Sequence, residues 1–108
     1  CLHPGARAEN RRWPPECFAA VGDRLHSATG LPVVLTGSSA EQPLTAAVAA
    51  AMRAPAFDAA GPISFGALAA QLSRAAIVVT NDTGVSHLAA ALRIPSVVIF
   101  RASELDRW

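Results

Sequence analysis

The sequence contains no lysine and no tyrosine, and it has only two cysteines among its 108 residues. Cys1 and Cys17 form no C-x-x-C pair, so they make neither a disulfide framework nor a structural metal site. We therefore expect a reducing compartment, the cytoplasm, with no metal and no cofactor. All nine basic residues are arginine, and alanine is very frequent. A GC-rich coding sequence produces this bias, so the choice of arginine says little about function.

Long apolar segments and an excess of charge are also missing. The longest apolar segment, residues 44–52, is interrupted by Thr45 and is far shorter than the ~20 residues of a membrane-spanning helix. No charged segment followed by an apolar one opens the chain, so we expect no secretory signal. The net charge of +1 gives no general attraction to nucleic acid, and no such partner is expected.

Apolar segments that do not alternate with polar residues predict strands buried on both faces of a parallel sheet. They comprise the first two residues, a weak candidate at 56–60, and residues 31–36, 76–80 and 96–100. Helical spacing of apolar residues predicts helices over 15–29, 40–53, 64–75 and 84–93. This alternation predicts an α/β fold with a Rossmann-like, doubly wound parallel sheet.

Particular residues mark the ends and faces of these helices. Pro15 suits the first turn of the first helix and Gly30 its C-cap, while Ser64 is the expected N-cap of the third. Phe65 and Leu92 are expected to face the core from the third and fourth helices. The chain begins inside a predicted strand and ends without a helix after the last one. We therefore expect it to be one half of a longer protein.

Ligands of open α/β sheets bind beyond the carboxyl ends of the strands, where three loops of this chain lie. The sharpest candidate is residues 80–87, Thr-Asn-Asp-Thr-Gly-Val-Ser-His, which leave a strand and open a helix. The N–H groups of Thr83, Gly84 and Val85 would meet a phosphate there. Asp82 would cap the helix or bind a sugar hydroxyl, and His87 lies one turn further on. An ordinary N-cap beside a chance histidine explains these residues about equally well.

The triplet Asp-Thr-Gly also occurs in aspartic proteases, where two carboxylates share a proton. Those proteins are all-β, whereas apolar residues at helical spacing follow the triplet here, so we set the hydrolase hypothesis aside. Motifs of other enzyme classes are absent: there is no G-x-G-x-x-G, G-x-x-x-x-G-K-[ST], Asp-x-Asp, H-E-x-x-H or G-x-S-x-G.

The two other loops carry weaker signals. The first holds Gly5, Ala6 and three arginines (Arg7, Arg11 and Arg12) that can bind a phosphate or form a solvated basic loop. It ends at Trp13, which we expect to anchor the entry into the following helix. The second places Glu41 beyond a strand end, where it can accept from ribose hydroxyls or close a capping box with Ser38.

Taken in order, several segments resemble one known family. They are His-Pro-Gly-Ala-Arg, Arg-Arg-Trp-Pro-Pro-Glu, Val-Val-Leu-Thr-Gly-Ser, Val-Val-Thr-Asn-Asp-Thr-Gly and Ser-His-Leu-Ala-Ala-Ala-Leu. Across essentially the whole chain, this pattern resembles the C-terminal half of glycosyltransferase family 9, the bacterial lipopolysaccharide heptosyltransferases.

The resemblance implies a GT-B fold, in which two Rossmann-like domains face each other across a cleft. Residues 1–108 would be the C-terminal domain, which binds the nucleotide-sugar donor, usually ADP-heptose. The reaction would be metal-independent and inverting, and would transfer heptose to the lipopolysaccharide inner core, with peripheral contact to the inner membrane. The acceptor and the catalytic aspartate would belong to the absent N-terminal domain, so no catalytic residue is assigned here. The alternative is a non-catalytic module of the same fold that binds a nucleotide or sugar phosphate.

The resemblance also implies roles for individual residues. Asp82, Thr83, Gly84 and His87 would contact the pyrophosphate and sugar of the donor, with Gly5 and Ala6 beside them. Arg11 stands where the family has a phosphate-binding lysine, and Glu41 near the acidic residue that contacts the nucleoside. The chain departs from the family pattern at Phe65-Gly66, where leucine and a polar residue are usual, and at Arg101, where glycine is common.

Overall fold

The computed structural model describes residues 1–6 and 12–100 of the chain. Five parallel strands form one sheet in the order β3-β2-β1-β4-β5. In chain order, β1 to β5 span Leu2–His3, Val33–Leu35, Ala56–Asp58, Val78–Asn81 and Ser96–Ile99. The order reverses between β1 and β4, as in doubly wound folds. The predicted α/β class and parallel sheet are therefore confirmed.

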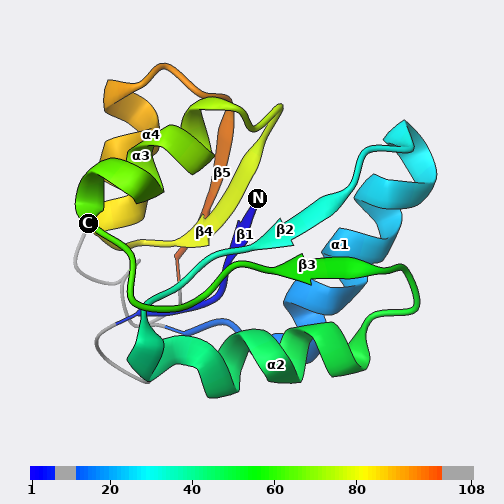
Figure 1. Ribbon diagram of the computed structural model, residues 1–108. Helices are drawn as coiled ribbons and strands as arrows, with labels where there is room; N and C mark the ends of the chain where they lie inside the picture. The colour runs from blue at the N-terminus through cyan, green and yellow to red at the C-terminus, as the bar shows by residue number, and fades with distance from the viewer. Residues whose placement is uncertain (7–11, 101–108) are drawn as a thin grey trace.

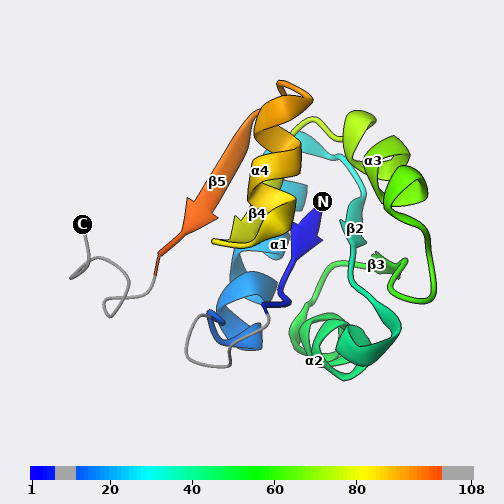
Figure 2. The ribbon, with the colours of Figure 1, turned by 90° about the vertical axis from the view of Figure 1, so that its left-hand side faces the viewer.

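Four helices cover the two faces of this sheet (Figures 1 and 2). Helices α1 (Pro15–Thr29) and α2 (Gln42–Ala51) pack together on one face, while α3 (Phe65–Ser73) and α4 (Gly84–Ala91) lie on the other. A short 3-10 turn, η2 (Ser39–Glu41), precedes α2. No helix in the described part of the chain is long and apolar enough to cross a membrane.

Each face of the sheet has its own hydrophobic core. The core under α1 and α2 is the larger and centres on Phe18, which is fully buried. Trp13 packs edge-on against Phe18 with ring centroids 5.4 Å apart, so the predicted anchor at the entry to α1 is confirmed. The second core contains Leu72 and Val78. Adjacent residues Val78 and Val79 of β4 belong to different cores because strand side chains alternate between faces.

The predicted helix boundaries hold best where caps are strong. Helix α1 has the predicted bounds, and Gly30 closes it in the left-handed conformation, with φ of 70°. The side chain of Ser64 accepts a hydrogen bond from the N–H of Ala67, which confirms the expected N-cap of α3. The predicted helix 40–53 is instead a 3-10 turn followed by α2. Pro43 lacks an N–H and sits in the first turn of α2.

Two expected core residues lie at the surface. The side chain of Phe65, the first residue of α3, is 70% exposed and lines the cleft described below instead of the core. Leu92 is 36% exposed because α4 ends at Ala91, and the chain then turns through Arg93 at a positive φ of 58°. Both expectations were wrong because helical periodicity was extended to residues at a helix end.

Candidate functional site

A cleft of about 340 Å³ opens at the carboxyl ends of the central strands. Residues from both halves of the sheet line it: His3, Gly37, Ser38 and Glu41 on one side, and Ile63, Ser64, Phe65, Leu68, Gly84 and Val85 on the other. Loops leaving neighbouring strands meet here because the strand order reverses between β1 and β4. The cleft is therefore where an open α/β sheet binds its ligand.

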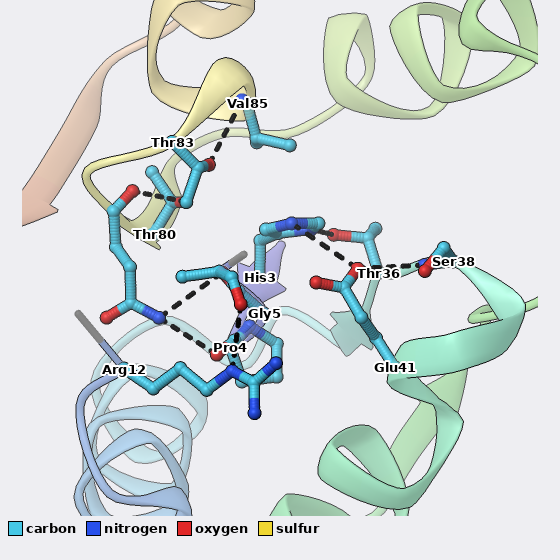
Figure 3. A network of polar contacts seen from close by, with 12 residues as sticks. His3, Pro4, Gly5, Arg12, Thr36, Ser38, Glu41, Thr80, Thr83 and Val85 are labelled. Carbon is cyan, nitrogen blue, oxygen red and sulfur yellow. Dashed lines mark hydrogen bonds and ion pairs between the residues drawn. The ribbon is translucent and has the colours of Figure 1, made fainter. Parts of the chain in front are cut away.

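The N-terminus of α4 forms one wall of the cleft. Thr83 is the N-cap: its Oγ1 accepts a hydrogen bond from the N–H of Val85 at 3.1 Å (Figure 3). Asp82 was expected either to cap this helix or to bind a sugar hydroxyl; the structure gives the cap to Thr83, which also occupies the Val85 N–H that was expected to meet a phosphate. The cap leaves the backbone of Gly84 facing the cleft, where a Cβ would meet nothing within 4 Å. An anion at this point would meet the positive end of the helix dipole.

Asn81 fixes the turn that leads into α4. Its side chain is fully buried, its Nδ2 donates to the carbonyl of Pro4 at 2.8 Å, and its Oδ1 accepts from the N–H of Trp13 at 2.9 Å. One amide therefore ties the end of β4 to both flanks of the arginine-bearing loop. Sequence reasoning placed Asn81 in the loop and assigned it no role. A buried amide at a strand end was the available signal.

Glu41 projects into the cleft from the end of η2. Its Oε1 accepts the N–H of Ser38 at 3.0 Å, which confirms that these residues interact as a capping pair. Oε1 also lies 4.0 Å from Nε2 of His3 (Figure 3). The carboxylate packs against Gly5, where a Cβ would overlap it. Capping thus does not remove Glu41 from the cleft but orients its carboxylate within it.

His3 is the buried partner of that carboxylate. It is the last residue of β1, and its Nδ1 lies 2.9 Å from Oγ1 of Thr36, which is also buried. Burial lowers the pKa of His3 below its ordinary value, and the negative charge of Glu41 opposes that shift. Sequence reasoning treated His3 only as the start of a loop. A polar residue beside a buried strand was the signal for it.

The other residues that the sequence predicts for the site are not part of the cleft lining described above. Gly5 and Ala6 are buried and do not line the cleft. Asp82 is half-buried just before α4, and His87 is exposed on α4, outside the cleft lining. Arg12 is tied to the protein, since its Nε donates to the carbonyl of Ala6 at 2.9 Å. Arg7, Arg11 and Arg101 lie outside the described residues.

The remaining wall of the cleft is apolar and was not anticipated. Ile63, Phe65 and Leu68 line it, and the Phe65 ring is the most exposed of the three. A flat aromatic surface beside polar groups suits a heterocyclic base. The described residues contain no cluster of three or more histidine, cysteine, aspartate or glutamate side chains with metal-ligand geometry. Their arrangement offers one anion site, one carboxylate and one apolar surface.

Comparison with known proteins gives a consistent result. The family model described as glycosyltransferase family 9 (heptosyltransferase) matches residues 1–108. Lipopolysaccharide heptosyltransferase 3 of Escherichia coli is 32% identical over 110 residues, covering 99% of this chain and 32% of its own length. The chain therefore spans about a third of that relative.

Two solved structures of proteins with such names resemble the fold of this chain closely. The glycosyl transferase family 9 protein from Veillonella parvula superposes with a TM-score of 0.85 at 27% identity, over 94% of this chain and 30% of its own. The ADP-heptose lipopolysaccharide heptosyltransferase II of E. coli also gives a TM-score of 0.85, at 29% identity, over 92% and 31% of the two chains.

Proposed function

Since the chain belongs to glycosyltransferase family 9, the heptosyltransferase family, we propose that it is the donor-binding half of an inverting heptosyltransferase. The donor is ADP-heptose, and the acceptor is the inner core of lipopolysaccharide. The observation that carries the proposal is the cleft in which Glu41 faces the N-terminus of α4. ADP is favoured because the related heptosyltransferase II of E. coli is named for ADP-heptose.

The diphosphate of the donor occupies the start of α4 in this proposal. Gly84 presents its backbone to the cleft without a side chain, so a phosphate oxygen can approach its N–H closely. The helix dipole favours a negative charge there by roughly 0.3–1 kcal/mol, and by up to ~2 kcal/mol when the site is partly buried. The hydroxyl of Thr83 keeps its proton for a phosphate while its oxygen caps the helix. Arg11 adds a cation from the neighbouring loop.

The nucleoside then lies across the cleft from the diphosphate. The Glu41 carboxylate accepts hydrogen bonds from the ribose hydroxyls, since an ionised carboxylate offers only acceptors. The adenine ring packs on the apolar wall made by Ile63, Phe65 and Leu68. The diphosphate, the ribose and the base of the donor therefore each have a matching surface in one cleft.

This half contributes orientation and electrostatic stabilisation to the reaction. Holding the donor in one pose removes much of the entropic barrier to attack by the acceptor. Negative charge develops on the departing diphosphate, and the α4 N-terminus with Arg11 stabilises it without a metal ion. The general base and the acceptor site belong to the other half of the protein. No residue of this chain acts as base or nucleophile in the proposed mechanism.

We place the protein in the cytoplasm, in peripheral contact with the inner membrane, where its acceptor is held. Both cysteines, Cys1 and Cys17, are free thiols, which fits a reducing compartment. The alternative function is a module that binds a nucleotide or sugar phosphate without catalysis. The site geometry supports binding in either case, so only turnover separates the two.

The test uses the full-length protein, ADP-heptose and a lipopolysaccharide core truncated before the heptose. Transfer of heptose in the presence of EDTA is expected, with inverted anomeric configuration in the product. The 108-residue fragment is expected to give no product, because the base and acceptor site are missing. Turnover by the fragment would contradict the two-domain mechanism. Nucleotide binding without transfer by the full-length protein would favour the binding module.

A further inference from the structure

His3 has no role in the proposed donor contacts, although the structure surrounds it with polar groups. The ring is buried at the end of β1, and each nitrogen faces a different residue (Figure 3). Nδ1 lies 2.9 Å from Oγ1 of Thr36, and Nε2 lies 4.0 Å from Oε1 of Glu41. A buried imidazole flanked on both sides in this way is held in one orientation and one tautomer.

The polar groups on both sides of the ring together indicate which tautomer this is. Oγ1 of Thr36 lies 3.5 Å from the carbonyl of Leu2, to which it can donate, and 2.9 Å from Nδ1 of His3. The 2.9 Å distance fits donation in either direction, so the carboxylate on the other side of the ring decides the tautomer. The ring proton then sits on Nε2 and points toward the carboxylate. The opposite tautomer would direct a lone pair at Glu41, which is unfavourable.

The Glu41 carboxylate is therefore held asymmetrically. The described donors to it, the Ser38 N–H and the Nε2–H of His3, both face Oε1. Oε2 lies on the Gly5 side of the group. At 4.0 Å, the His3 contact is a charge–dipole attraction rather than a hydrogen bond, so it orients the carboxylate without saturating it.

We propose that His3 is a positioning residue that fixes the Glu41 carboxylate through Nε2–H, so that Oε2 accepts a hydrogen bond from a hydroxyl of the donor's ribose. The inference rests on the proposed function, since it requires a nucleotide with a diol in this cleft. Thr36 supports the same arrangement, because its hydroxyl can donate to Nδ1 in this tautomer. His3 itself does not touch the nucleotide.

The test compares two substitutions that differ in reach. The amide nitrogen of glutamine reaches the position of the histidine Nε2, whereas that of asparagine reaches only the position of Nδ1. His3→Gln therefore keeps a donor facing Glu41, and His3→Asn removes it. Binding of ADP and of 2′,3′-dideoxy-ADP to the full-length protein is measured by calorimetry for the wild type and both variants.

The readout is the affinity ratio between the two nucleotides. In the wild type, ADP is expected to bind at least about tenfold more tightly, the effect of one hydrogen bond to a charged group. His3→Asn is expected to bring this ratio close to one, and His3→Gln to retain most of it. A purely structural role for His3 would weaken both nucleotides equally and leave the ratio unchanged. An unchanged ratio in His3→Asn overturns the inference.

Failure of the proposed function gives a different result: the wild type would not bind ADP at all. A wild type that binds both nucleotides equally would retain the nucleotide site but overturn the role of His3.

A second measurement needs no folded variant at position 3. The ¹⁵N shifts of the three histidines report their tautomers, and His3 is expected to be neutral with its proton on Nε2. A proton on Nδ1 would overturn the inference. Thr36→Val, which removes the hydroxyl, is expected to lower the affinity ratio, whereas Thr36→Ser keeps it.

Discussion

The carboxylate of Glu41 lies against the Cα of Gly5, in the space that a Cβ on Gly5 would fill. The two residues come from different loops, one after β1 and one at the end of η2. This contact explains why position 5 is a glycine, because any larger residue would overlap the Glu41 carboxylate. A positive φ is not the reason, since Gly30 is the glycine with a positive φ among the described residues. The glycine therefore sets the position of the carboxylate.

Gly5→Ala is expected to weaken ADP binding while the protein stays folded. The overlapping atoms are the far end of a flexible side chain, so Glu41 is expected to rotate away and lose the hydrogen bond proposed for it with the ribose. Affinity should fall about tenfold, the effect of one hydrogen bond to a charged group. Calorimetry measures the affinity. Gly66→Ala is the control, because its Cβ would meet only Ser64 Oγ, at 3.9 Å.

Gly84→Val is expected to abolish ADP binding with little change in melting temperature or far-UV circular dichroism. A side chain at position 84 has open space in the structure, so the fold tolerates it. The same space is the approach of the proposed diphosphate. Wild-type affinity in the folded variant would exclude the start of α4 as the phosphate site. A large loss of stability would instead indicate that Gly84 serves the turn alone.

Alanine substitutions of Arg11 and Arg12 are expected to differ in effect, the first on ADP affinity and the second mainly on stability. Arg11→Ala should weaken ADP binding by roughly 1–3 kcal/mol, the loss of a charge-assisted hydrogen bond. Arg12 donates to the carbonyl of Ala6, so Arg12→Ala should lower the melting temperature and affect affinity less. Titration and thermal melting of both variants provide the comparison. An equal or larger binding defect in Arg12→Ala would show that the cationic position is assigned to the wrong arginine.

Asp23 is expected to make stability depend on pH on the acid side. Its carboxylate accepts the N–H groups of Ala54 at 2.9 Å and Arg53 at 3.0 Å, and these hydrogen bonds lower its pKa. A lowered pKa in the folded state stabilises the protein above the ordinary aspartate pKa. That contribution is lost as the pH falls below about 4. Asp23→Asn should lower the melting temperature at pH 7 and leave it closer to wild type at pH 3. An equal difference at both pH values would contradict this prediction.

The sequence predicts most of the fold because the strands and helices obey different periodicities. Helix α1 is the clearest case, since Pro15 and Gly30 mark both of its ends. The errors fall where an element ends. Phe65 fits the apolar stripe of α3, but it is the first residue of that helix and its side chain is exposed. The helical spacing of apolar residues predicts which way a side chain points. It does not predict where the helix, or the sheet beside it, ends.

The site was predicted only in part, for a related reason. Gly84 and Glu41 were found because they follow strand ends in sequence. His3 and Asn81 were assigned no role, since their function depends on partners distant in sequence: Asn81 bonds to Pro4, 77 positions away. Capping of α4 was one of two roles expected for Asp82, and Thr83 forms the cap instead; aspartate and threonine both cap helices well.

The residues that line the two walls of the cleft differ in how much a substitution costs in folding stability. His3 belongs to the two-residue central strand β1, which pairs with strands on both sides, so a substitution there disturbs the middle of the sheet. Ile63 and Phe65 are exposed and lie at the start of α3, where replacement costs little folding stability. New ligand preferences can therefore arise by substitutions in the apolar wall, while the wall that holds the carboxylate is constrained by the stability of the sheet.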